Sequence, residues 1–306
     1  MLLSSMTAWQ SIHLFVAERG DLDILALEAA TLMGGLPAGR HDWFFIRYLE
    51  GGLHLRLRIG AEAGGHFPAI RAHMAAACAR LGAGRSPEPW ALRLRHPDAA
   101  GELHAVGVAI DVPYAPEVRR YAGPAGLLIN EQLFRDSTRV ALAVIRASRG
   151  DARRRVGLAM ELMLAGVIGL CGADAAPQDF MRRYAAFWRA AWRETGLATH
   201  VRGAAGISFA ASCARYRDVA AGKRPITSPI DDWCAALAAA RAGFAELHAS
   251  GALHAPATGA ATQGAQALAA ALASLAHSQI HMLNNRLGLW PHDEIAMADV
   301  LAEHLP

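Results

Sequence analysis

The sequence lacks the short motifs that mark most nucleotide-dependent, zinc-dependent and serine-hydrolase enzymes. Its 306 residues contain no Walker loop, no GxGxxG after a predicted strand, no HExxH and no GxSxG. Lysine is almost missing too, because Lys223 is the single lysine among 30 basic residues. The missing motifs exclude the sites that define those enzyme classes. Because lysine is so scarce, any cationic binding site in this chain has to be made mainly of arginine.

Cysteine is scarce and follows no ligand pattern. The four cysteines lie far apart, without CxxC or Cys/His spacing: Cys78, Cys171, Cys213 and Cys234. This pattern predicts reduced, mostly buried thiols in a cytoplasmic protein. The N-terminus has no basic segment followed by a long apolar run, so we expect no signal peptide. The longest apolar stretch, 157–176, is interrupted by Glu161 and by glycines, which favours a buried helix over a membrane span.

A strong charge of one sign is also absent. The formal net charge is +3 in a chain that is 53% hydrophobic and 19% charged. That composition is typical of a globular protein, and the small charge gives no reason to expect binding to nucleic acid or to an anionic membrane. We therefore expect neither partner.

The first third of the chain mixes strand and helix patterns. Aromatic and β-branched residues predict strands over 9–16, 42–49, 53–59 and 101–112. The second and third of these strands form a predicted hairpin around the turn Glu50-Gly51-Gly52. Apolar spacing predicts helices over 21–35 and 66–82.

Helical spacing dominates from about residue 124 onward. It predicts helices over 125–147, 151–169, 177–195, 230–250 and 263–289. The Ala/Gly/Thr-rich stretch 249–266 is interpreted as a flexible connection. We therefore predict a single α+β domain over residues 1–306, with a small, mainly antiparallel sheet in the N-terminal part and a predominantly helical C-terminal part packed on it.

Arginine and histidine concentrate first in "LHLRLR", residues 53–58. On a strand, His54, Arg56 and Arg58 share one face, and the leucines share the other. Two guanidinium groups roughly 6–7 Å apart repel each other unless solvent or an anion lies between them. The alternatives are a solvated basic face and a carboxylate-binding face, since the planar guanidinium group binds carboxylates bidentately.

Two further segments concentrate polar side chains. In "PYAPEVRRYAGP", 113–124, two arginines lie between tyrosines in a loop, and Glu117 offers a partner that could simply fix that loop. In "HSQIHMLNNRLG", 277–288, His277 and His281 are one helical turn apart. A third ligand at a recognised spacing is missing, so we expect no metal there. A structural and a functional interpretation stay open for both segments.

Taken in order, these segments resemble the small C-terminal domain of class I lantibiotic dehydratases, which also occurs alone as the thiopeptide-type bacteriocin biosynthesis protein. The resemblance extends from Trp9 to about Leu305. The matching residues are Trp9, Phe44 to Tyr48, His54 to Arg58, Tyr114, Glu117, Arg120, Tyr121, Gly123, Glu131, Phe134, Asp136, Ser137, His281, Met282, Asn285, Arg286 and Leu287. Ala122 departs from the pattern, because the family has glycine at that position.

In that family the full-length enzyme attaches glutamate from glutamyl-tRNA to Ser and Thr of a precursor peptide. The small domain then eliminates the glutamate and leaves dehydroalanine or dehydrobutyrine. The resemblance therefore implies a cytoplasmic carbon–oxygen lyase of bacteriocin and antibiotic (RiPP) biosynthesis that needs no metal or organic cofactor. It also implies two partners, the glutamylated precursor peptide and a separate glutamyl-tRNA-dependent glutamylation protein.

The resemblance assigns roles to individual residues. β-Elimination needs a base for the α-proton, stabilisation of an enolate-like intermediate, and cations for the departing glutamate. Arg56, Arg58 and Arg120 match the carboxylate-binding positions, and His281 matches the histidine for proton transfer, acting as base, acid or enolate stabiliser. The substrate-binding residues implied are Arg47, Tyr121, Asn285 and Arg286.

Two other functions remain open. The same fold serves thiopeptide pyridine synthases, which join two dehydroalanines in a formal [4+2] cycloaddition and release the leader peptide. That branch has generally lost the elimination residues, so their presence here favours elimination. A non-catalytic subunit that presents peptide to a partner is the third possibility.

Overall fold

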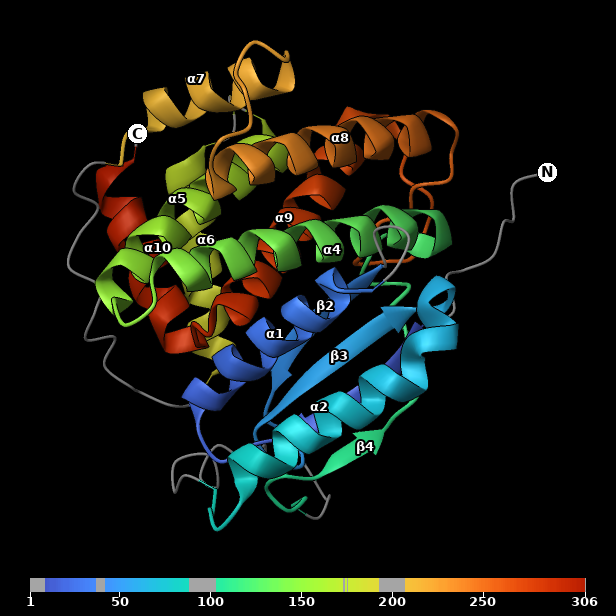
Figure 1. The fold of residues 1–306 in the computed structure, drawn as a ribbon. Coiled ribbons are helices and arrows are strands. Elements are labelled where there is room, and N and C mark those ends of the chain that lie inside the picture. Colours follow the sequence, from blue (N-terminus) through green and yellow to red (C-terminus); the bar gives the residue numbers. More distant parts are fainter. Residues whose placement is uncertain are drawn as a thin grey trace. The chain divides into compact units, whose positions relative to one another are not determined.

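The chain folds into two units. The computed structural model describes residues 9–36, 42–87, 103–172, 174, 176–192 and 207–305 (Figure 1). Contacts between residues divide the chain into two units, Met1–Ala115 and Pro116–Pro306. The single functional domain expected over 1–306 stays a prediction.

The first unit contains a four-stranded antiparallel sheet. Its strands are β1 (Trp9–Phe15), β2 (Trp43–Tyr48), β3 (His54–Gly60) and β4 (Ala109–Asp111), in the order β2-β3-β1-β4. The predicted hairpin is confirmed, since β2 and β3 pair from Trp43 opposite Ile59 to Tyr48 opposite His54. The strand predicted over 101–112 is shorter than expected, and its first two residues lie outside the described part of the chain.

The alternation seen in the sequence sorts side chains to the two faces of this sheet. Leu55, Leu57 and Ile59 are fully buried together with Ile12 and Leu14 of β1. Helices α1 (Arg19–Gly34) and α2 (Phe67–Gly82) cover this apolar face, and the short helix η1 (Ala61–His66) leads into α2 (Figure 1). Burial of these aliphatic side chains drives the packing of the two helices on the sheet.

The second unit is helical. Its helices are α4 (Gly123–Ala147), α5 (Ala152–Cys171), α6 (Pro177–Ala191), α7 (Phe209–Ala220), α8 (Pro229–Ala249), α9 (Gly264–Leu287) and α10 (Pro291–His304). Helix α5 is the core of the unit, because residues 162–170 are all buried and it contacts α7, α8 and α9. The helices predicted from the sequence are confirmed where they are described, whereas α7 and α10 were not predicted. Residues 193–195 lie outside the described residues.

The segment 249–266 differs from the flexible connection predicted for it. Leu253 is fully buried, and the hydroxyl group of Thr262 donates to its carbonyl oxygen at 3.1 Å. The backbone nitrogen of Thr262 donates to the same carbonyl, and His254 pairs with Ala261 in an isolated β-bridge. Small residues without apolar periodicity gave no sign of these local hydrogen bonds, which hold the segment in a fixed conformation.

The observed elements confirm the α+β class. The apolar stretch 157–176 lies largely in α5 as a buried helix. No helix within the described ranges is long and apolar enough to cross a membrane. The four cysteines are unpaired, two buried and two half-buried, and burial raises the pKa of the Cys78 and Cys234 thiols to about 12. Those two thiols are therefore protonated at neutral pH.

Candidate functional site

Arg56 is held on one face of the sheet by contacts on three sides. Its guanidinium carbon lies 3.5 Å from the centre of the Tyr48 ring, a cation–π geometry. Its Nε donates to Nε2 of His54 at 3.0 Å, and its Nη2 lies 3.8 Å from Oε2 of Glu50. In the register of the sheet, His13 of β1 stands opposite Arg56. The Arg56 side chain is 18% exposed, so a bound anion could reach it.

Arg58 lies two residues further along the same face of β3. Its guanidinium carbon is 4.8 Å from the centre of the Tyr114 ring and 5.4 Å from that of Phe44. The pairing of Ser11 with Arg58 places a small side chain beside it. The two arginines thus share one sheet face, as predicted, and aromatic rings flank both.

Arg47 lies on the other face of the sheet. It stands opposite Leu55, and its Nη2 donates to Oδ1 of Asp23 in α1 at 2.6 Å. Only 4% of Arg47 is exposed. The structure therefore does not bring Arg47 together with Arg56 and Arg58. Its ion pair with Asp23 links β2 to α1. Its role in substrate binding stays a prediction.

His281 belongs to a buried network in the second unit. Glu294 of α10 is fully buried, and its Oε1 lies 2.9 Å from Nδ1 of His281. Its Oε2 accepts from the hydroxyl group of Tyr184 and, at 3.3 Å, from Nδ2 of Asn284. An ionised carboxylate can only accept, so Nδ1 of a neutral His281 carries the proton and Nε2 carries the lone pair. We call these four residues the His281 network.

The surroundings of His281 are aromatic. The Trp188 ring centre lies 4.2 Å from that of His281. One turn earlier on α9, His277 packs against Tyr184 and Phe187 with ring centres 4.6 Å away in both cases. Burial, with smaller contributions from His281 and Arg120, lowers the pKa of His277 to about 4. His277 is therefore neutral near pH 7 and adds no positive charge to the surroundings of His281.

Arg120 reaches the same stretch of α9. Its Nε donates to the hydroxyl oxygen of Ser278 at 3.4 Å, and its Nη1 forms an ion pair with Glu117 at 3.1 Å. Ser278 precedes His281 by three residues and therefore lies on a neighbouring side of the helix. The structure thus brings two of the predicted catalytic residues, Arg120 and His281, to one region of the second unit.

The loop that carries Arg120 is fixed by buried amide groups. Nδ2 of Asn130 donates to the carbonyl oxygens of Tyr121 and Gly126, at 3.2 and 2.8 Å. Its Oδ1 accepts from Gln279 of α9 at 2.7 Å, and both amide side chains are fully buried. This chain of hydrogen bonds sets the position of the loop on α4 and α9.

The backbone conformation at Ala122 is one that favours the glycine of the family pattern. Its φ is +65°, the single positive φ of a non-glycine residue among those described. Glycine adopts this left-handed conformation without steric cost, whereas an L-residue pays roughly 1–2 kcal/mol. The loop keeps this conformation although Ala122 replaces the glycine, and its buried neighbours hold it there.

The other predicted substrate-binding residues, Tyr121, Asn285 and Arg286, make contacts within the second unit. The Tyr121 ring packs edge-on against Phe134 with centres 4.9 Å apart. Arg286 is fully buried, and it donates to the hydroxyl oxygen of Thr138 at 3.2 Å and to the carbonyl oxygen of Met282 at 2.8 Å. Asn285 is half-buried, and its carbonyl oxygen accepts from Gly288 at the end of α9. The Arg286–Thr138 hydrogen bond joins α9 to α4. The substrate-binding roles of Tyr121, Asn285 and Arg286 stay predictions.

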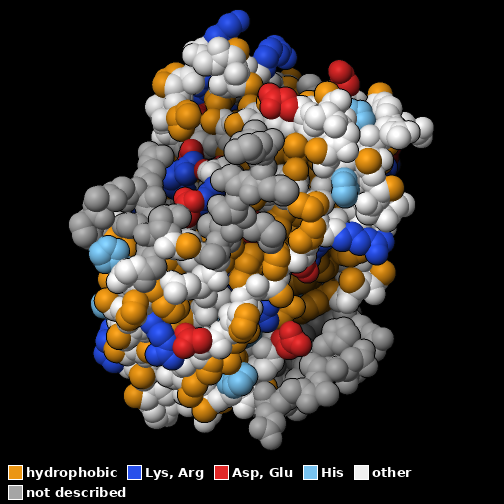
Figure 2. Space-filling view, turned by 90° about the vertical axis from the view of Figure 1, so that its right-hand side faces the viewer, with side chains coloured by type: hydrophobic (Ala, Val, Ile, Leu, Met, Phe, Trp, Pro, Cys, Tyr) orange, Lys and Arg blue, Asp and Glu red, His pale blue; other side chains and the backbone are white. Residues whose placement is uncertain are grey.

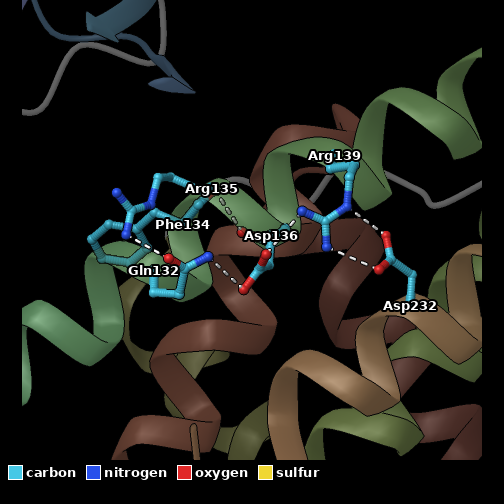
Figure 3. Close-up of polar contacts among 7 residues, drawn as sticks. Gln132, Phe134, Arg135, Asp136, Arg139 and Asp232 are labelled. Atoms are coloured by element: carbon cyan, nitrogen blue, oxygen red, sulfur yellow. Dashed lines mark hydrogen bonds and ion pairs between the residues drawn. The ribbon is translucent and has the colours of Figure 1, made fainter. Parts of the chain in front are cut away.

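The Asp136 motif position belongs to an ion-pair network between α4 and α8 (Figure 3). Arg139 binds Asp232 of α8 bidentately at 2.8 and 2.9 Å, and its Nη1 binds Asp136 at 2.9 Å. Gln132 donates to the other oxygen of Asp136 at 3.1 Å. The hydrogen bonds and the charge of Asp232, with that of Asp136, raise the pKa of Arg139. Asp136 therefore helps to hold two helices together.

Glu294 and Tyr184 were not identified from the sequence. Glu294 lies 13 residues after His281, beyond a turn and in a helix that was not predicted. The available signal was Pro291 followed by the acidic residues Asp293 and Glu294, which is typical of a helix N-terminus. That signal alone gives no partner for the carboxylate.

The described residues do not form a metal-binding cluster. They contain no group of three or more His, Cys, Asp or Glu side chains arranged to hold a metal ion. On the face drawn in Figure 2, arginine and acidic side chains are dispersed among hydrophobic ones. The candidate residues are thus Arg56 and Arg58 in the first unit, and Arg120, His281 and the buried Glu294 in the second.

Comparison with known proteins identifies the family of the chain. A family model described as Lantibiotic biosynthesis dehydratase C-term matches residues 9–305. The chain is similar to the solved structure of TsrL, with a TM-score of 0.64 and 16% identity over 97% of this chain and 94% of that one. A comparison with curated proteins found no match.

Two other solved structures are similar. One is TbtD, described as a pyridine synthase from thiomuracin biosynthesis, with a TM-score of 0.65 and 18% identity over 97% of both chains. The other is the tRNA-dependent lantibiotic dehydratase MibB from Microbispora sp. 107891, with a TM-score of 0.52 and 19% identity. This match covers all of the present chain and 28% of MibB. At such identities the similarity establishes a shared fold.

Proposed function

Because the chain belongs to the lantibiotic biosynthesis dehydratase C-terminal family, we propose that it eliminates glutamate from O-glutamylated Ser and Thr of a ribosomally made peptide. The products are dehydroalanine or dehydrobutyrine and free glutamate. The observation that carries this proposal is the orientation of His281 by the buried carboxylate of Glu294, with Arg120 reaching the same helix.

His281 is the proposed base for the α-proton. With Nδ1–H donated to Glu294, the Nε2 lone pair is available to accept the α-proton of the glutamylated residue. The electrons of the Cα–H bond form the Cα=Cβ double bond, the Cβ–O bond breaks, and its electron pair leaves with the glutamate. Glu294 stabilises the imidazolium that forms, as the carboxylate of a catalytic triad does.

The arginines stabilise the negative charge that develops on the leaving glutamate. Glutamate bound as an ester offers one carboxylate and leaves as a dianion. Arg56 and Arg58 bind the carboxylate of the glutamyl group, and Arg120 stabilises the negative charge that grows during elimination. Cations that bind the dianion more tightly than the ester lower the barrier selectively.

A pyridine synthase is the second candidate. The observation that favours it is the shared fold, because TbtD, which is described as such an enzyme, matches over nearly the whole of both chains. We keep elimination as the proposal because a base, its orienting carboxylate and the matched arginines suit that reaction.

One experiment separates the functions. The pure protein is given a peptide carrying glutamyl-Ser, and its mass is followed. Loss of the glutamate mass supports elimination. An intact peptide, together with conversion of a bis-dehydroalanine peptide to a macrocycle and a freed leader, supports the pyridine synthase. Stable binding without turnover of either peptide supports a non-catalytic subunit.

Single substitutions test the assigned residues. Arg56→Ala and His281→Ala should each let glutamylated peptide accumulate, whereas Arg80→Ala, an exposed arginine at the end of α2, should not. If both residues act on the same bound substrate, the double variant should lose less activity than the product of the two single effects. Full activity in both single variants would overturn the site assignment.

The proposed partners follow from the reaction. The substrate is a glutamylated precursor peptide, so a separate glutamyl-tRNA-dependent protein must act before this one. Glutamyl-tRNA is a cytoplasmic molecule, and we place this protein in the same compartment. Added glutamylating protein and glutamyl-tRNA should therefore convert an unmodified precursor, which this protein alone leaves unchanged.

A further inference from the structure

His54 occupies a fixed place beside Arg56 on the sheet. Its ring is fully buried and packs against the rings of Phe15 and His13 on β1, with ring centres 4.5 and 4.8 Å away. Nδ1 of His54 lies 2.7 Å from the carbonyl oxygen of Gly52, and Nε2 lies 3.0 Å from Nε of Arg56. Both ring nitrogens therefore have a partner, on opposite sides of the ring.

These partners fix the tautomer of His54. A carbonyl oxygen can only accept, so Nδ1 carries the proton, and an arginine Nε can only donate, so Nε2 presents its lone pair. Desolvation, opposed by the Gly52 hydrogen bond and reinforced by Arg56, His13 and His104, lowers the pKa of His54 to about 3. A second proton on the ring would set two donors against each other at Nε2.

The turn before β3 is shaped for this contact. Gly52 has φ +120°, a conformation that side-chain-bearing residues rarely adopt, and an added Cβ would lie 3.4 Å from the Phe15 ring. Its backbone nitrogen closes the turn on the carbonyl oxygen of Leu49 at 3.0 Å. The two glycines of the hairpin thus allow the Gly52 carbonyl to point at His54.

We propose that His54 is the residue that positions Arg56 for carboxylate binding, by accepting the Nε–H of its guanidinium group. With the Nε side of the fork engaged, Arg56 can address a carboxylate only through its Nη atoms, and Tyr48 fixes the plane in which they lie. His54 contacts no reacting atom in this assignment. The inference rests on the proposed function for the identity of the bound carboxylate, whereas the His54–Arg56 contact stands on its own.

Two substitutions separate the acceptor from the rest of the ring. In His54→Gln the side-chain oxygen can take the place of Nε2, so the acceptor for Arg56 is kept. In His54→Asn the amide nitrogen can take the place of Nδ1, so the Gly52 hydrogen bond is kept and the acceptor is lost. His73→Asn, on the exposed side of α2, is the matched control for a His-to-Asn exchange.

The kinetic test uses glutamyl-Ser peptide and the full chain. His54→Asn should lower kcat/KM about 10- to 100-fold, the range for losing a hydrogen bond to a charged group. His54→Gln should stay within about threefold of the parent, and His73→Asn should be unchanged. Equal losses in both His54 variants would reduce His54 to a packing residue, and full activity in His54→Asn would overturn the proposal.

A spectroscopic test needs neither turnover nor a variant. Nitrogen-15 spectra of the histidine rings should show His54 as the Nδ1–H tautomer, with Nε2 unprotonated, at pH 7 and still at pH 5. A proton on Nε2 would overturn the contact even if the protein eliminates glutamate. The expected tautomer in a protein that turns over no glutamylated peptide would preserve the contact and refute the proposed function alone.

Discussion

Replacing Glu294 by glutamine tests how the His281 network works. Oε1 of Glu294 faces Nδ1 of His281, whereas Oε2 accepts from both Tyr184 and Asn284. Glutamine has one oxygen and one amide nitrogen, so Glu294→Gln cannot accept at both positions. Each orientation of the new amide disrupts one side of the network.

The two orientations have different consequences. An amide nitrogen toward His281 forces its proton onto Nε2, and the lone pair needed for the α-proton is then lost. An amide nitrogen toward Asn284 leaves a buried donor without its acceptor, which costs about 1–3 kcal/mol of unfolding free energy. The first orientation keeps more hydrogen bonds, so we expect it to dominate.

The expected result is a large loss of rate with a small loss of stability. Glu294→Gln should lower kcat for elimination by about 100-fold or more, since general-base catalysis contributes 10²–10⁴-fold. KM should change little, because Glu294 is fully buried and contacts no substrate. The midpoint of thermal unfolding should fall by only a few degrees, as expected for about 1–2 kcal/mol in a unit of this size.

The assay compares three proteins. Kinetics and thermal unfolding are measured for the parent, for Glu294→Gln and for Glu303→Gln, an exposed glutamate on the same helix. The control should match the parent in both measurements. A Glu294→Gln variant with parental kcat would refute the orientation of His281 by Glu294 as a requirement for catalysis.

The helix packing and the buried histidine give two further predictions. Gly169→Ala would place a Cβ 2.7 Å from Cβ of Leu237, so it should lower the unfolding free energy by about 1–3 kcal/mol. Gly157→Ala on the same helix meets no atom within 4 Å and should raise the unfolding free energy by about 0.5–1 kcal/mol. Urea unfolding of both variants measures the difference. His277 has a folded pKa of about 4, below the ordinary histidine pKa of 6.5, so the unfolded chain binds more protons between these values and stability should fall as pH drops through that window. His277→Phe should reduce that slope by about one proton, and an unchanged slope would contradict the burial of a neutral His277.

The alternation of apolar and polar residues made the sheet predictable. In "LHLRLR" a period of two assigns leucines and arginines to opposite faces, and the strand pairing agrees. The face of Arg47 was not predictable in the same way, because β2 is apolar on both sides and its register against β3 decides where each side chain points. Pairing Arg47 with Leu55 places it on the apolar face.

The His281 network shows what a single sequence hides. Its members come from α6, α9 and α10, and Tyr184 and Glu294 are 110 residues apart. Periodicity predicted α6 and α9 but not α10, and it does not indicate which helix faces meet. The resemblance supplied His281, whereas the carboxylate that orients it became visible only in the structure, where α10 packs on α6 and Glu294 reaches His281 and Asn284 of α9.

Neutral histidines beside arginines are a common feature of both units. His13 and His54 lie near Arg56, and burial, with the charges of neighbouring arginines, holds the pKa of His13 at about 4 and that of His54 at about 3. His277 has a similarly low pKa near Arg120. A neutral imidazole can accept a hydrogen bond from a guanidinium group without adding charge or competing with a bound anion. A carboxylate in the place of His54 would instead add a negative charge next to Arg56, whereas the neutral histidine fixes the arginine without adding one.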